Sequence, residues 1–197
     1  MSTKECEIDI KIFTFKYIKS NLNTFASLDP QYLEELNSYA ERLILYDFSN
    51  IKDFHKKVNL HISKNISLLL DNVIERYTKE LSWCIFQWTN RKYETVAIHS
   101  LTVAFNNLLC AFYLTEGVYP PSVKWRASKQ YLFSLNKGKE VFYLMEEWMK
   151  IINIENIDKC LSIFFKLENL ISNDFTIDSW KKYKERKWWL SYKVDFL

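Results

Sequence analysis

A stiff proline corner followed by two cations contains the residue types in this sequence best suited to chemistry. Tyr119 opens the run Tyr-Pro-Pro-Ser-Val at 119–123, and Lys124, Trp125 and Arg126 follow it. Both prolines fix their own φ, so the corner predicts the start of a helix. Cations at this position could hold phosphates or another anionic substrate at the mouth of a cleft, with Trp125 packed beneath them. The structural alternative is that Trp125 anchors the corner while solvent surrounds the cations.

Asp9 is the acidic candidate. It stands in Glu-Ile-Asp-Ile at 7–10, where polar and apolar residues alternate as in a half-buried strand. On the polar face of such a strand, Asp9 would either face a cleft or be an ordinary residue in contact with solvent.

Arg91 and His99 form a third candidate, because these two residue types act on RNA phosphodiesters in the HEPN ribonucleases. The spacing resembles the short Arg-His motif of that family but is longer, with seven residues between the two. On a continuous helix they would lie about two turns apart on nearly one face, and Asn106 would extend the row. A structural histidine on a helix face is the alternative. His55 and His61 have no carboxylate partner at ligand spacing, and we interpret them as surface residues.

The segment from Lys181 to Trp189 mixes cations with aromatic residues. Such a mixture can bind nucleic acid through phosphate contacts and stacking. The alternative is a helix whose aromatic stripe of Trp180, Tyr183 and Trp188 docks on the core.

Composition narrows the class of protein. With 48% hydrophobic and 17% aromatic residues among 197, the chain can bury a substantial core. The net charge of +3 is too small to predict nucleic-acid binding by itself. The four cysteines lack the spacing of a zinc site and predict buried or free thiols. No leader and no membrane-spanning run is evident, so we expect a cytoplasmic protein.

The elements that would position these residues form two parts. At 1–50, alternation at 7–15, an Asp-Pro helix start at 29–30 and an apolar run at 42–46 predict a strand, a helix and a strand. At 51–197, apolar residues recur every three or four positions, which predicts an antiparallel bundle of five or six helices. The first would be long, with a break near Asn59, and a short joint at 89–90 would return the chain antiparallel. Further helices are expected at 122–135, 139–152, 155–172 and 177–190. The fold class is therefore mainly α.

The segment from Arg42 to Tyr131 resembles the end of the catalytic domain and the helical C-terminal domain of bacterial nucleotidyltransferases. These belong to the polymerase-beta-like superfamily and are related to aminoglycoside nucleotidyltransferases. A strand ending in Leu-Tyr-Asp at 45–47, a helical hairpin, and a Tyr-x-Pro-x-x-Lys-Trp corner at 119–125 carry the resemblance. The resemblance implies that the corner binds substrate through Tyr119, Lys124, Trp125 and Arg126. It also implies that Asp9 is the third catalytic carboxylate and that 1–50 is a remnant of the nucleotidyltransferase sheet.

The superfamily's metal motif, a Gly-Ser turn followed by two aspartates one residue apart, is absent from the 197 residues. We therefore expect no cofactor for this chain alone, and Mg²⁺ with ATP or another nucleotide if a partner completes it. The partner would be a separately encoded catalytic subunit, and a homodimer is also open. The acceptor could be an aminoglycoside, another small hydroxyl compound, a protein side chain or an RNA end. The alternatives are a non-catalytic helical module that binds protein or RNA, and a HEPN-like ribonuclease.

Overall fold

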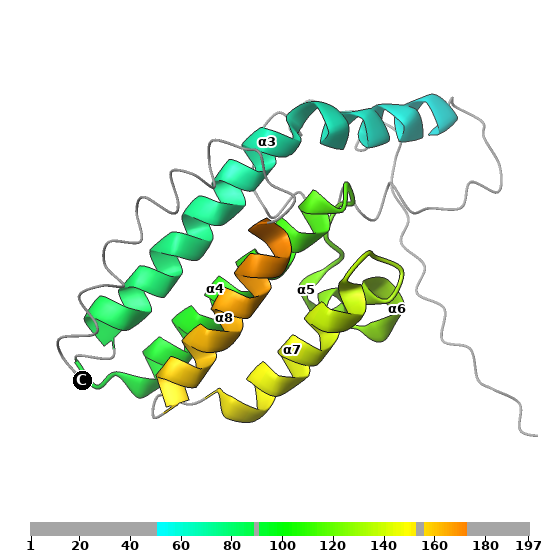
Figure 1. Cartoon of the computed structure of the whole chain (residues 1–197). Coiled ribbons are helices and arrows are strands. Elements are labelled where there is room, and N and C mark those ends of the chain that lie inside the picture. Colours follow the sequence, from blue (N-terminus) through cyan, green and yellow to red (C-terminus); the bar gives the residue numbers. More distant parts are fainter. Residues whose placement is uncertain (1–50, 89–90, 153–155, 173–197) are drawn as a thin grey trace, which may run out of the picture.

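The computed structural model describes residues 51–88, 91–152 and 156–172, which form helices and contain no strand (Figure 1). The elements are α3 (Ile51–Trp83), a π-helical turn η1 (Cys84–Trp88), α4 (Glu94–Thr115), α5 (Val123–Arg126), α6 (Lys129–Leu132), α7 (Gly138–Ile151) and α8 (Ile157–Ser172). The mainly α class is confirmed for this part of the chain. The strands expected at 7–15 and 42–46, the helix after residue 29 and the helix at 177–190 lie outside the described residues.

The four long helices α3, α4, α7 and α8 run alternately up and down (Figure 1). Helix α3 packs along α4, α7 packs along α8, and α8 also packs on α4. At the joint between α3 and α4, the Cys84 thiol donates to the carbonyl oxygen of Ala97 across 3.4 Å. The antiparallel hairpin expected from a short joint is confirmed, since a short connection leaves two helices no other way to pack.

Helix α4 lies at the centre of the bundle, in contact with α3 and α8. Every residue from Leu108 to Leu114 is buried, so this helix is apolar around its whole circumference in its last two turns. Within the described ranges, α4 is the one helix that is long and apolar enough to span a membrane by length and composition. Its most apolar window is 56% buried inside the bundle, and its central position accounts for its apolar composition.

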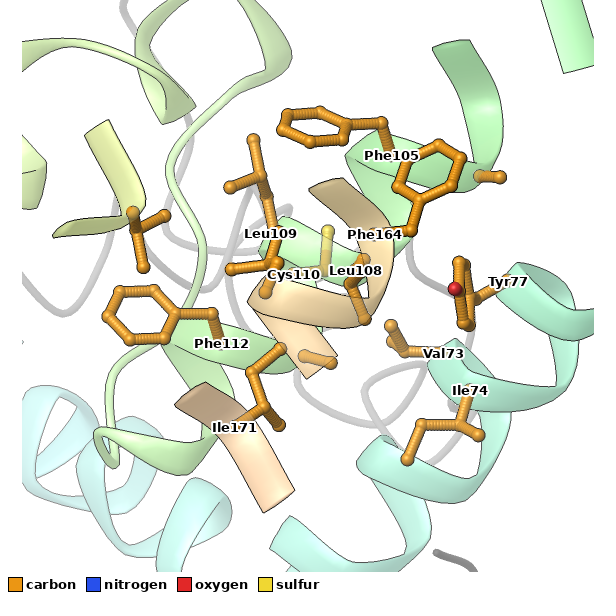
Figure 2. Packing of buried hydrophobic residues seen from close by; sticks show 14 of the residues in the cluster. Val73, Ile74, Tyr77, Phe105, Leu108, Leu109, Cys110, Phe112, Phe164 and Ile171 are labelled. Atoms are coloured by element: carbon orange, nitrogen blue, oxygen red, sulfur yellow. The ribbon is translucent and has the colours of Figure 1, made fainter. Parts of the chain in front are cut away.

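Four aromatic side chains, one from each long helix, meet in the core. The Phe105 ring stacks on Trp148 with centroids 4.3 Å apart, and Phe164 lies 5.6 Å from Phe105 and 6.4 Å from Trp148. Tyr77 meets the edge of Phe164 at 6.1 Å. Figure 2 shows Tyr77, Phe105 and Phe164 directed into this shared interior. We call these four residues the aromatic hub, because it is the place where α3, α4, α7 and α8 all meet.

A buried polar pair lies beside the hub. The Tyr77 hydroxyl donates to Oε1 of Glu168 across 2.6 Å, and Glu168 is only 3% exposed. A buried carboxyl group requires hydrogen-bond partners, and this bond from α3 provides one to α8. Glu168 stands four residues after Phe164 and seven after Leu161, within the apolar stripe of α8. The pair therefore links the first and last of the described helices in a fixed register.

Two of the expected helix boundaries are wrong. Helix α3 continues through Asn59 without a break. The single helix expected at 122–135 is instead two one-turn helices, α5 and α6, because Ser128 between them has an extended backbone with ψ 148. The helix expected at 139–152 is α7, and the one expected at 155–172 is α8, each within two residues of its predicted ends.

The joint between α6 and α7 depends on a close approach of two backbone segments. A Cβ atom on Gly138 would lie only 1.7 Å from the carbonyl oxygen of Leu132. Lys137 just before it has a left-handed backbone, φ 55, which turns the chain sharply into α7. The Lys137 ammonium donates to the carbonyl oxygen of Leu170 in the last turn of α8. This cation at a helix C-terminus is electrostatically favourable and joins the α6–α7 turn to the end of α8.

Candidate functional site at the proline corner

The corner begins where α4 ends. Gly117 has φ +73, and the amide of Val118 donates to the carbonyl oxygen of Tyr113 across 3.0 Å. This left-handed glycine with a hydrogen bond back into the last turn is a common way to close a helix. Pro120 and Pro121 are buried, and the extended backbone of Ser122 leads into α5. The corner is therefore rigid and closely packed against the bundle.

Arg126 is the residue that fixes the corner to the bundle. It is 4% exposed, and its Nη1 donates to the carbonyl oxygen of Asn106 in the middle of α4 across 3.4 Å. Its own carbonyl oxygen accepts a hydrogen bond from the Tyr113 hydroxyl at 2.7 Å. A buried guanidinium requires such partners because removing a charge from water is costly. Both bonds join α5 to α4, so Arg126 has a clear structural role.

Trp125 lies on the exposed side of the corner. Trp125 is 49% exposed, so it is not buried against the bundle, and of the two cations Lys124 lies over its ring. The expectation that both cations are solvated is wrong, since Arg126 is buried while Lys124 is exposed. A one-turn helix offers only one inward position, and the longer guanidinium, which can reach α4, occupies it.

Lys124 and Trp125 form the accessible part of the corner. The Lys124 ammonium lies 5.5 Å from the centroid of the Trp125 ring, within the range of a cation–π contact. This pair offers a positive charge to an anion and a flat apolar surface to a ring. Tyr119, in contrast, is 2% exposed and belongs to the core. The structure thus divides the four predicted substrate-binding residues into two exposed and two buried ones.

The remaining candidate sites are Asp9, the cation-rich segment near the C-terminus and the Arg91–His99 pair. Asp9 and the segment from Lys181 to Trp189 lie outside the described residues. Arg91 lies in the turn before α4, so the continuous helical register expected from Arg91 to His99 is wrong. The Arg91 guanidinium lies 5.9 Å from the Trp88 ring, and the Asn106 amide donates to the carbonyl oxygen of Thr102. Both groups therefore have local structural partners.

Within residues 51–88, 91–152 and 156–172, no three His, Cys, Asp or Glu side chains gather as they would around a metal ion. The reading of the cysteines as buried or free thiols is confirmed for Cys84, Cys110 and Cys160, which are all buried and unbridged. The fourth cysteine, Cys6, is outside the described part of the chain.

Sequence reasoning missed a second group of exposed aromatic side chains close to the corner. Phe133 and Tyr143 are 38% and 61% exposed, and lysines 129 and 139 lie near phenylalanine rings on α6 and α7. The signal in the sequence was the alternation of lysines with aromatic residues from 124 to 143.

The structural role of Arg126 leads to a prediction. We expect Arg126→Ala to lower the free energy of unfolding by about 2 kcal/mol, because it removes a buried hydrogen bond from a charged donor together with the packing of the side chain. Lys124→Ala should stay within about 0.5 kcal/mol of the parent, as is usual for exposed positions. Urea unfolding followed by circular dichroism would measure both. Equal effects of the two changes would contradict the assignment of Arg126 to the core.

Comparisons of the chain with protein families, with curated proteins and with solved structures found no match.

Proposed function

We propose that this chain is the substrate-side helical domain of a nucleotidyltransferase-like protein and does not transfer nucleotides alone. The resemblance of the corner at 119–125 to the nucleotidyltransferase corner suggests the family. The observation that carries the proposal is the exposure of Lys124 and Trp125 on a corner fixed by the buried Arg126. Because the backbone of the corner is rigid, it holds one exposed cation and one exposed ring in fixed positions. Such a pair could bind an anionic or ring-containing acceptor in one orientation.

Catalysis would require a second polypeptide. The sequence has only two glycines, Gly117 and Gly138, and neither precedes a serine, so the Gly-Ser turn of the superfamily is absent from it. Two aspartates from a partner would hold Mg²⁺ against the nucleotide triphosphate, which stabilises the charge that develops during transfer. In this proposal Asp9 adds the third carboxylate, the complex takes Mg²⁺ and ATP or another nucleotide, and the protein is cytoplasmic.

The test measures nucleotide binding and transfer separately. We expect calorimetric titration of the 197-residue chain with Mg-ATP to show no saturable binding. The product of a neighbouring reading frame that carries the Gly-Ser and paired-aspartate motif should restore labelling of an acceptor by radioactive ATP. In that complex, Lys124→Ala and Trp125→Ala should each lower labelling about tenfold or more without changing the unfolding midpoint. Labelling by the chain alone would contradict the proposal.

A non-catalytic interaction module is the second candidate, and one observation favours it. Exposed aromatic rings and lysines continue from the corner onto α6 and α7, beyond the two side chains that the first proposal requires. Exposed aromatic residues are enriched where proteins contact macromolecules. This candidate predicts binding without any nucleotide transfer, which the same labelling assay would distinguish.

A further inference from the structure

Exposed rings and lysines alternate over α5, α6 and the first turns of α7, the short helices and the helix start that lie together at one end of the bundle (Figure 1). Three of the rings are substantially exposed: Trp125 at 49%, Phe133 at 38% and Tyr143 at 61%. We call this surface the cation–aromatic face, and its exposed members are Lys124, Trp125, Lys129, Phe133, Lys139 and Tyr143.

Ring and cation contacts make the part on α6 and α7 continuous. Phe133 meets the edge of the largely buried Phe142 at 5.5 Å, and the Phe142 ring in turn lies 5.8 Å from Tyr143. The ammonium of Lys129 lies 5.2 Å from the Phe142 ring, and that of Lys139 lies 5.8 Å from the Phe133 ring. Buried Phe142 therefore lies between the exposed rings of Phe133 and Tyr143 and contacts both.

The corner joins this surface through its backbone. The amide of Ser128, the residue just before α6, donates to the carbonyl oxygen of Trp125 across 2.9 Å. The Lys124 ammonium again lies close to a ring, that of Trp125, at 5.5 Å. Each exposed lysine of the face thus lies near an aromatic ring, and a flexible lysine can leave its ring when a flat ligand stacks there.

The charge of this end of the molecule favours an anionic partner. Five of the six charged residues between Val118 and Tyr143 are cations, and Glu140 is the one carboxylate of this segment. Glu116, just before the segment, also lies at this end, because its Oε2 accepts a hydrogen bond from the amide of Asn136. Arg126 is buried and Lys137 bonds to Leu170, so Lys124, Lys129 and Lys139 remain as the exposed cations. The whole chain has a net charge of only +3, and an excess of four positive charges within this short segment is therefore a local concentration.

We propose that the cation–aromatic face binds single-stranded nucleic acid. Unpaired bases stack on exposed aromatic rings while lysines contact the phosphates between them, and both kinds of group are present here in alternation. An acidic peptide would use the lysines but leave the rings without a role, and a duplex would keep its bases stacked inside. This inference gives the interaction-module candidate a site and a partner class, and it does not depend on the nucleotidyltransferase proposal.

The experiment uses the 197-residue chain and two fluorescein-labelled probes, a twelve-nucleotide oligouridylate and the matching oligothymidylate. Fluorescence anisotropy at low salt should show saturable binding of at least one probe. Trp125→Ala and Tyr143→Ala should each weaken binding about fivefold to 100-fold through the loss of a stacked base. The combined change Lys124→Gln, Lys129→Gln and Lys139→Gln should lower the slope of log affinity against log salt by about 2.

The chain provides a matched control on α3. The Lys79 ammonium lies 4.8 Å from the ring of Trp83, which is 40% exposed, so this pair has the same chemistry outside the face. Lys79→Gln and Trp83→Ala should leave binding unchanged. Circular dichroism of every variant should match the parent, because all the substituted side chains are exposed. An equal loss of affinity in the control variants would overturn the proposal, since binding would then be non-specific.

Three further results would also overturn it. One is the absence of saturable binding of either probe at low salt. Another is competition. If polyglutamate of equal charge competes as effectively as unlabelled oligonucleotide, the face binds acidic polymers in general and does not select nucleic acid. The last is loss of binding on replacing the cations of 181–187 by alanine while the face variants bind normally. None of these results bears on nucleotide transfer, so the two proposals can fail separately.

Discussion

Replacing Phe164 by alanine is expected to lower the free energy of unfolding by about 3–5 kcal/mol, the largest effect we expect of any single substitution. Phe164 is fully buried at 0% exposure, and its ring contacts Tyr77, Phe105 and Trp148, the other three members of the aromatic hub. Its removal would leave a cavity bordered by all four long helices. Because those helices hold one another in place there, none can move to fill the cavity without losing contacts elsewhere.

Urea unfolding of the 197-residue chain, followed by both circular dichroism and tryptophan fluorescence, would measure this loss. Phe165→Ala is the matched control, since it removes the same side chain one position along α8, where the ring is only partly buried. We expect a loss smaller by about 2 kcal/mol for this control. Equal losses for the two changes would show that the hub does not hold the four helices together.

Gly138→Ala is expected to cost about 3 kcal/mol, although it adds a single methyl group at a helix start. The new Cβ would lie 1.7 Å from the carbonyl oxygen of Leu132 and 2.6 Å from its carbonyl carbon. These are backbone atoms, so no rotation of a side chain can relieve the overlap. The α6–α7 joint would have to open, which would separate Phe133 from Phe142 and disturb the cation–aromatic face.

The other glycine of the chain is the control for this prediction. Gly117 has φ +73, but nothing lies within 4 Å of the position where a Cβ would stand. Gly117→Ala should therefore cost only the strain of a left-handed backbone, about 1 kcal/mol. Thermal unfolding of the two variants in parallel would rank them. A larger loss for Gly117→Ala than for Gly138→Ala would contradict the close approach of α6 and α7.

The long helices could be predicted from sequence because their apolar stripes are long enough to be unambiguous. Apolar residues at steps of four, Leu69, Val73, Tyr77 and Leu81, predict the buried side of α3, and all four are buried. The predicted ends of α7 and α8 lie within two residues of the observed ones. In a stripe of this length, apolar residues recur every three or four positions over several helical turns, so the pattern predicts both the helix and its buried side.

The short elements could not be predicted in the same way. A helix of one turn has no repeat to detect, so α5 and α6 looked like one helix from 122 to 135. Nothing in the sequence pattern marks Glu168 as buried, although it lies inside the stripe of α8 and accepts a hydrogen bond from Tyr77. The Tyr77–Glu168 bond joins residues far apart in the chain, and no local pattern records such a contact.

The sequence by itself determined the mainly α class of the described residues, the antiparallel hairpin of α3 and α4, and that Cys84, Cys110 and Cys160 are thiols outside any disulfide. These properties follow from periodicity, a short joint and side-chain type, which all act locally. Only the tertiary structure decided that Arg126 faces inward while Trp125 faces solvent, and that Phe142 brings Phe133 and Tyr143 into one surface. The physical reason is that the exposure of a side chain depends on which neighbouring element its helix turn packs against. Here the carbonyl group of Asn106 in α4 accepts a hydrogen bond from the Arg126 guanidinium, so Arg126 is the side chain that turns inward.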